Sequence, residues 1–163
     1  MTVYSFTDTI PANTAASAPR EHKLKLCPGV IVQAIVNPPH GVQFLARFQL
    51  LDGLLNVLPG REDEYYTGEG GPESLPMWYE LRKSPYELTW ITWNVDDFYP
   101  HEILLKLVVL PFEAASQLKE MKGILEKLEN LSDKIGPKQI ELLTQLSKDI
   151  KQLLQLMQGT KRK

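Results

Sequence analysis

Along the stretch before Pro111, apolar and polar residues alternate at nearly every second position. Val30 to Asn37 and Val42 to Leu50 are rich in β-branched and aromatic residues, with polar ones between them. Tyr86 to Trp93 alternates large residues with threonine, and His101 to Leu110 carries isoleucine, leucine and valine along one face. A period of two is typical of strands with one buried face. The pattern therefore predicts four strands of a sheet protein.

Weaker patterns predict further short strands, and turn residues separate them. These strands are expected at 23–26, 54–58 and 77–83, with an edge strand or an arm at 3–6. The segment 37–41, which reads NPPHG, is too rich in proline to lie inside a strand. About seven or eight strands with short connections favour antiparallel pairing, because parallel strands need longer crossovers. We therefore expect an antiparallel β-sandwich, for which a jelly-roll and an immunoglobulin-like topology both satisfy the pattern.

The composition changes abruptly at Pro111. Of the 14 aromatic residues, 13 precede it, and the exception is the adjacent Phe112. The chain beyond is made largely of Leu, Lys, Glu and Gln, with no Tyr or Trp. These residues are good helix formers, and a proline suits the first turn of a helix. The expected organisation is a β-sandwich over residues 1–111 followed by an amphipathic two-helix segment over residues 112–163.

Apolar residues in this last segment recur at spacings of three and four, which is typical of amphipathic helices. Gly136-Pro137 interrupts the pattern, because a proline inside a helix costs about 3 kcal/mol. Two arrangements satisfy the pattern: a helical hairpin around Ser132 to Gly136, or a kinked pair that bundles with other copies as in a coiled coil. A lone hairpin buries little surface, so it must pack on the sheet or on other subunits. Of these two, we favour subunits, through homo-oligomerisation or contacts with other assembly subunits. The residues expected to form these contacts are Leu118, Met121, Leu125, Leu128, Leu143, Leu146, Ile150, Leu153 and Met157.

Charge and cysteine content limit the kinds of partner and compartment. Residues 112–163 carry ten basic and seven acidic side chains, and the rest of the chain carries eight and thirteen. Neither part has the basic cluster that nucleic-acid binding needs, so we expect no nucleic-acid partner. The single cysteine, Cys27, excludes a disulfide within the chain. The sequence predicts neither a signal peptide nor a membrane span, which suits a cytoplasmic or virion protein.

The residue pattern contains no signature of catalysis or of a cofactor site. The three histidines, His22, His40 and His101, lack the spacing of metal ligands. The motifs G-x-S-x-G, G-x-G-x-x-G and the P-loop are absent. His101 closely follows Asp96 and Asp97, so we expect it to hydrogen-bond an aspartate as part of the fold. We therefore expect a protein that is not an enzyme and holds no metal or cofactor.

The aromatic residues offer an alternative to a purely structural role. Trp90 and Trp93 lie on opposite faces of one predicted strand, so at most one of them joins a given surface. Aromatic side chains with a polar end are suited to half-exposed binding surfaces. The alternative function is a carbohydrate- or receptor-binding β-sandwich on a helical stalk. Its candidate ligand-binding residues are Trp78, Trp93, Tyr65 and Tyr66.

Five segments share a rhythm of proline, glycine, asparagine and aromatic residues. They read IPANT at 10–14, PGVI at 28–31, NPPHG at 37–41, SPYEL at 84–88 and WNVDDFYPH at 93–101. This set resembles small, uncharacterised β-sandwich proteins, jelly-roll-like in form, of viral or mobile-element origin. The resemblance spans residues 10–111, leaves the helices unmatched and implies a virion or assembly component. The preferred interpretation is a non-enzymatic capsid, vertex or tail protein that oligomerises through its C-terminal helices.

Overall fold

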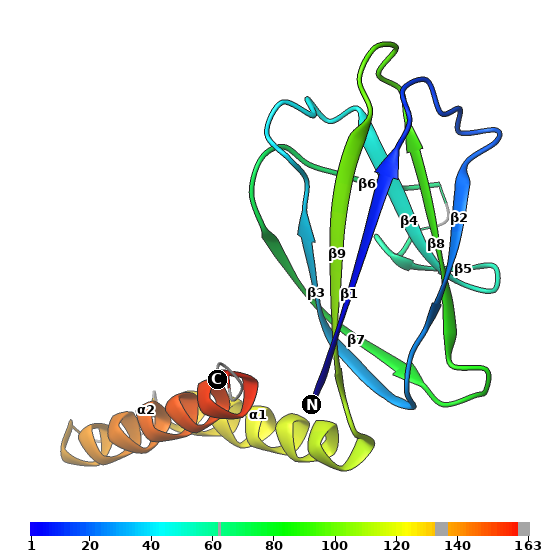
Figure 1. Ribbon diagram of the computed structural model, residues 1–163. Helices are drawn as coiled ribbons and strands as arrows, with labels where there is room; N and C mark the ends of the chain where they lie inside the picture. Colours follow the sequence, from blue (N-terminus) through cyan, green and yellow to red (C-terminus); the bar gives the residue numbers. More distant parts are fainter. Residues whose placement is uncertain (62, 133–136, 160–163) are drawn as a thin grey trace. The chain divides into compact units, whose positions relative to one another are not determined.

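The computed structural model describes the chain except residues 62, 133–136 and 160–163. The chain divides into two compact units, Met1–Phe112 and Glu113–Lys163. The first unit is built of strands in two sheets, and the second contains two helices (Figure 1). The predicted class, mainly antiparallel β with two helices at the C-terminal end, is confirmed.

Within residues 1–61 and 63–112, nine strands form two sheets, and every strand pair is antiparallel. One sheet has the order β1-β9-β3-β7, with β1 at Thr2–Ile10, β9 at His101–Leu110, β3 at Gly29–Asn37 and β7 at Glu73–Leu81. The other has the order β2-β8-β4-β5, with β2 at Arg20–Lys25, β8 at Glu87–Asn94, β4 at Ala46–Asp52 and β5 at Leu55–Leu58. The short β6, Tyr66–Thr67, pairs with β4. Successive strands mostly lie in opposite sheets, which makes the unit sandwich-like.

The two sheets share one apolar core. Trp90 of β8 and Phe48 of β4 meet edge to face, with ring centroids 6.2 Å apart. The opposite sheet supplies the inward face of β9, where the predicted alternation is confirmed by the burial of Ile103, Leu105, Leu107 and Val109. Burial of such side chains stabilises a domain by about 1.5–3 kcal/mol each, so this layer dominates the stability of the unit.

The predicted strand from Val42 to Leu50 is wrong in its first half. β4 begins at Ala46, and Gln43 and Phe44 have positive φ angles of 49° and 62°. A distant residue accounts for the turn: the Glu69 carboxylate accepts hydrogen bonds from the backbone N–H groups of Gly41 and Gln43. A continuous strand would place Phe44 on the same face as the buried Ala46 and Phe48, but Phe44 is exposed as a consequence of the turn.

Other boundaries differ less from the sequence expectation. β7 occupies 73–81 and not 77–83, and β8 begins one residue later than predicted because Tyr86 has a φ of 52°. The segment predicted as an edge strand or an arm is the edge strand β1, which extends to Ile10. The short β6 was not predicted, since two residues carry too little pattern.

The helices are α1, Phe112–Ser132, and α2, Pro137–Gly159, and apart from Phe112 they lie in the second unit. Pro137 is the first residue of α2, which fits the rule that proline is tolerated where a helix begins. The predicted hairpin turn at Ser132 to Gly136 lies, apart from Ser132, outside the described residues. In Figure 1 the two helices lie side by side with the chain running in opposite directions.

A matched pair of leucine substitutions tests the core assignment. Leu105 is 0% exposed and Leu54 is 98% exposed. Leu105→Ala is expected to lower the free energy of unfolding by about 2–5 kcal/mol, because it leaves a cavity. Leu54→Ala should change it by less than about 0.5 kcal/mol. Urea denaturation of both variants measures the difference, and equal losses would contradict the assignment.

Candidate functional site

The structure divides the predicted contact residues of α2 between two faces. Leu146 and Leu153 are exposed, together with Leu142, and their spacings of four and seven place all three on one face. Ile150 is half-buried, and Leu154, four residues further on, is buried. The predicted set therefore mixed an inward face with an outward one. The side chains of Leu143 and Met157 lie outside the described residues.

The predicted residues of α1 are more covered than those of α2. Leu118 is buried, and Met121, Leu125 and Leu128 are half-buried. Ile124, which the heptad pattern left out, is 52% exposed.

An ion pair shows where the two helices lie alongside each other. Lys151 Nζ of α2 lies 2.9 Å from Glu129 Oε1 of α1. Lys151 is fourteen residues beyond the start of α2, or about 21 Å at 1.5 Å per residue. Glu129 is only three residues before the end of α1, or about 5 Å. Because the helices run in opposite directions, most of the first half of α2 extends past the end of α1. The exposed Leu142 and Leu146 belong to this projecting half.

The four aromatic residues proposed for ligand binding do not gather on one surface. Trp93 is only 6% exposed, and the ring of Tyr65 meets it edge to face at 5.4 Å. The Arg47 guanidinium lies over the Tyr65 ring, 4.5 Å from its centroid. Tyr66 packs against a core phenylalanine and hydrogen-bonds a glutamate. Trp78 lies apart on β7, in the other sheet, and is 39% exposed.

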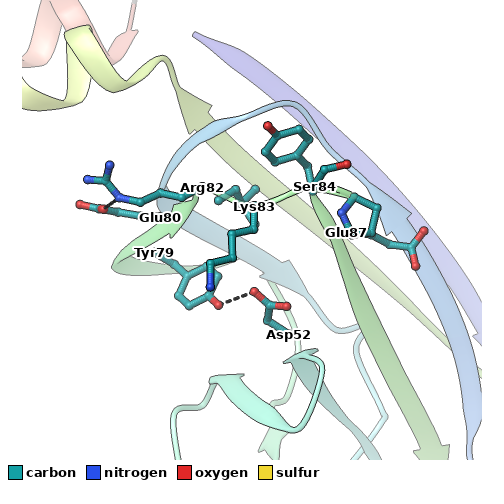
Figure 2. A pocket seen from close by; sticks show the side chains of 10 residues that line it. Asp52, Tyr79, Glu80, Arg82, Lys83, Ser84 and Glu87 are labelled. Atoms are coloured by element: carbon teal, nitrogen blue, oxygen red, sulfur yellow. Dashed lines mark hydrogen bonds and ion pairs between the residues drawn. The ribbon is translucent and has the colours of Figure 1, made fainter.

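An open pocket of about 490 Å³ lies where the end of β7, the start of β8 and Asp52 meet (Figure 2). The Tyr79 hydroxyl donates a hydrogen bond of 2.6 Å to Asp52 Oδ2. Burial, and then this carboxylate, raises the pKa of Tyr79 to about 12, so the hydroxyl remains a donor at neutral pH. The Lys83 side chain extends toward Tyr79 and Asp52 in Figure 2, and Glu87 lines the wall near β8. Such a mixture of aromatic, acidic and basic groups can bind a small polar ligand.

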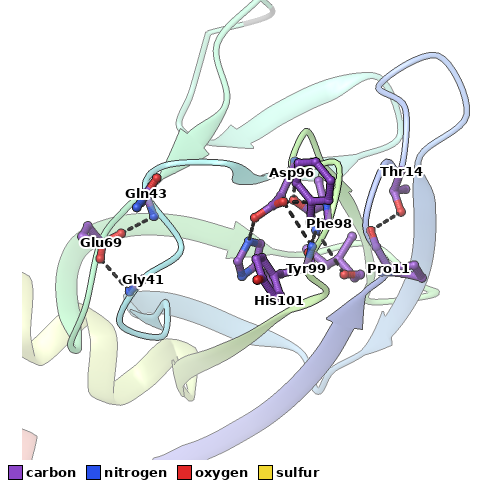
Figure 3. A network of polar contacts seen from close by, with 11 residues as sticks. Pro11, Thr14, Gly41, Gln43, Glu69, Asp96, Phe98, Tyr99 and His101 are labelled. Atoms are coloured by element: carbon purple, nitrogen blue, oxygen red, sulfur yellow. Dashed lines mark hydrogen bonds and ion pairs between the residues drawn. The ribbon is translucent and has the colours of Figure 1, made fainter.

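The predicted hydrogen bond between His101 and an aspartate is confirmed (Figure 3). His101 Nε2 lies 2.9 Å from Asp96 Oδ2, and both side chains are largely buried. The other oxygen of Asp96 accepts the backbone N–H groups of Phe98 and Tyr99 at 2.8 and 3.1 Å. The Phe98 bond, foremost among these contacts, lowers the pKa of Asp96 against the opposing effect of desolvation. Both oxygens thus hold the β8–β9 loop in one conformation.

A second carboxylate, which the sequence analysis missed, joins the two sheets. Asp8 of β1 is buried and receives the Arg20 guanidinium, with Nη2 to Oδ1 at 2.9 Å. Thr92 of β8 donates to Asp8 Oδ2 at 2.6 Å, and His22 Nε2 lies 3.0 Å from the same oxygen. Burial by itself would raise the pKa of Asp8, but the hydrogen bonds from Arg20 and Thr92, with His22 nearby, lower it below the usual aspartate range. The sequence contained one signal for this cluster: Asp8 occupies an inward-facing position of β1, in alternation with exposed residues.

Among residues 1–61, 63–132 and 137–159, no three His, Cys, Asp or Glu side chains are grouped so that they could hold a metal ion. In the same part of the chain, neither helix combines the length and the apolar character needed to cross a bilayer.

Removing the Asp8 carboxylate tests its role between the sheets. Asp8→Asn is expected to lower the free energy of unfolding at neutral pH by about 1–3 kcal/mol, because hydrogen bonds to a charged group are lost. Since the pKa of Asp8 is lower in the folded protein than the usual 3.8, its contribution is present above that value. The contribution disappears as the pH falls through the lower, folded-state pKa.

Urea unfolding between about pH 7 and pH 2 measures this effect. The variant should lose less stability in acid than the wild type does. Asp97→Asn, the same chemical change at an exposed position of the β8–β9 loop, serves as the control. It should alter neither the free energy of unfolding at neutral pH nor the loss of that free energy in acid. An unchanged acid profile in the Asp8 variant would contradict the assignment.

No protein-family model matches this chain, and no curated protein is significantly similar to it. The candidates for function are therefore the projecting half of α2 and the pocket beside Asp52.

Proposed function

We propose that this chain is a non-enzymatic structural subunit of an ordered assembly, such as a virus capsid, vertex or tail, and that it joins its neighbours through α2. The observation that carries the proposal is the half of α2 that extends past the end of α1. It presents Leu142 and Leu146 to solvent, and Leu153 continues their face. Covering each leucine is worth about 1.5–3 kcal/mol, which favours association with the helices of other copies.

The strand order supports a jelly roll as the body of this subunit. Leaving aside the two-residue β6, the strands pair in a nested series: β1 with β9, β2 with β8, β3 with β7, and β4 with β5. Folding a long antiparallel ribbon over itself produces such nesting, with alternate pairs in opposite sheets. Jelly rolls of this kind are common in viral capsid proteins and in lectins. The fold alone does not specify a function, so the weight of the proposal rests on α2.

Charging the projecting half of α2 tests the association. Leu142→Glu combined with Leu146→Glu is expected to lower the solution mass of the full chain, because a buried carboxylate would oppose helix packing. Light scattering on a sizing column measures the mass. The control combines Gln152→Glu with Gln155→Glu, which adds the same charge at exposed positions of the same helix. The control should keep the mass of the wild type. The proposal is contradicted if the Leu142→Glu and Leu146→Glu double variant keeps that mass as well.

A second candidate is supported by the pocket beside Asp52. A binding module for glycans or a receptor would use the Tyr79 hydroxyl, the Asp52 carboxylate and the Lys83 ammonium as hydrogen-bonding groups. In this alternative, Trp78 on the same strand supplies an exposed ring for stacking.

A glycan array separates the two candidates. Binding through the pocket should fall about tenfold in Tyr79→Phe, which removes one hydroxyl, and the Asp52→Asn variant should weaken it similarly. Binding that is lost in Trp78→Ala but kept in Tyr79→Phe would place the ligand outside the pocket. An array without any reproducible signal would remove the second candidate.

A further inference from the structure

The two sheets have four edges, and three of them are protected against pairing with another chain. β2 carries a charged side chain at four of its six positions. β7 contains Pro76, which has no N–H to donate. β5 has four residues and β6 has two, so the remaining edge is short and interrupted. Charges, prolines and short strands are the devices by which natural sheets prevent association at their edges.

β1 lacks the outward-facing charges, the proline and the shortness that protect the other three edges. It has nine residues without proline, lysine or arginine, and its register with β9 runs from Thr2 to Ile10 without a shift. Its one charged residue, Asp8, faces inward and is paired with Arg20. The exposed positions are Thr2, Val3, Ser5, Thr7 and Thr9, all uncharged.

The outer side of β1 has unused backbone groups. Within the described part of the chain, β1 forms a strand ladder only with β9, and no other backbone hydrogen bond involves residues 2–9. A nine-residue strand is about 30 Å long at 3.4 Å per residue. A row of unpaired N–H and C=O groups of that length is a template for another strand.

We propose that β1 pairs antiparallel with β1 of a second copy of this chain across a two-fold axis. In such an isologous contact each copy covers the free edge of the other, so a single pairing leaves neither β1 edge exposed. The strand is suited to face itself, because no exposed charge would meet a like charge and hydroxyl side chains pair favourably across antiparallel strands. The contact joins two four-stranded sheets into one continuous sheet. It uses the β unit alone and is independent of the contact proposed for α2.

The first test introduces a charge on the edge of β1. It uses the full chain carrying Leu142→Glu and Leu146→Glu, so that association through α2 is already suppressed. In this background the chain should be a dimer in sedimentation equilibrium. Thr7→Lys should raise the dimer dissociation constant about tenfold or more, because lysine on an edge strand opposes pairing. Ser17→Lys, at an exposed position outside the strands, should leave the constant unchanged.

The second test locates the contact by crosslinking. Cys27→Ser removes the only native thiol, and Ser5→Cys with Thr7→Cys then places two thiols on the exposed side of β1. Directly opposed residues of antiparallel strands have Cβ atoms about 4.5–5.5 Å apart, so small shifts permit disulfides between copies. Mild oxidation should give a covalent dimer linked through residues 5 and 7. Glu21→Cys with Lys23→Cys is the matched control on the charged edge of β2.

Three results would overturn the proposal: a monomer in the background variant at every concentration tested, a dimer that Thr7→Lys leaves intact, or crosslinking no stronger at β1 than at β2. Circular dichroism of each variant ensures that a loss of mass reflects lost pairing and not unfolding. If the α2 variants keep the mass of the wild type while the β1 crosslink forms, the α2 proposal fails and the β1 proposal stands.

Discussion

The apolar layer shared by the two sheets is the interaction on which the rest of the β unit depends. Each sheet has one apolar face, and neither face would be stable in water without the other. Trp90 and Phe48 from one sheet meet the inward face of β9 from the other. Because this layer lies between strands that are distant in the sequence, it also sets the nested pairing order. The Asp8 and Asp96 clusters add polar links at the margin of the same layer, where water can reach the Arg20 guanidinium.

Among its described residues the helical unit has fewer buried apolar side chains, namely Ala115, Leu118 and Leu154, and this contrast underlies the proposed role in assembly. Leu154 is 8% exposed while its neighbour Leu153 is 52% exposed. The helix α2 therefore has one buried apolar face and one apolar face in contact with solvent. Two helices have too few facing positions to bury both stripes. The β unit completes its own core, whereas the exposed leucines of α2 are the basis of the proposal that the helical unit binds neighbouring copies. The unprotected β1 edge adds a second place where the chain is open to another copy.

Strands with a strong alternation could be predicted from the sequence, because their pattern reflects the one apolar layer directly. β8 and β9 are examples, and the bond between His101 and Asp96 was predictable because the two residues are close in the sequence. The turn at Gln43 and Phe44 was missed because its cause, the Glu69 carboxylate, is distant in sequence. The Asp8 cluster was missed for the same reason, since its partners depend on how β1, β2 and β8 are arranged.

The helix contacts show a different limit of sequence reasoning. A spacing of three and four identifies an apolar helix, but it does not say which leucines face the neighbouring helix. Leu146 and Leu153 were grouped with Ile150, although they lie on a more exposed face. The pocket beside Asp52 could not be foreseen either, because Tyr79 and Asp52 approach one another only through the sheet arrangement.

The solution mass of the full chain, compared with that of a chain ending at Pro111, tests the central claim most directly. The full chain is expected to form an oligomer larger than a dimer. The shortened chain should retain its β-sheet circular dichroism and be no larger than a dimer. A full chain that is monomeric over the whole concentration range, or a shortened chain with the same subunit number as the full one, would contradict the claim that the helices hold the assembly together.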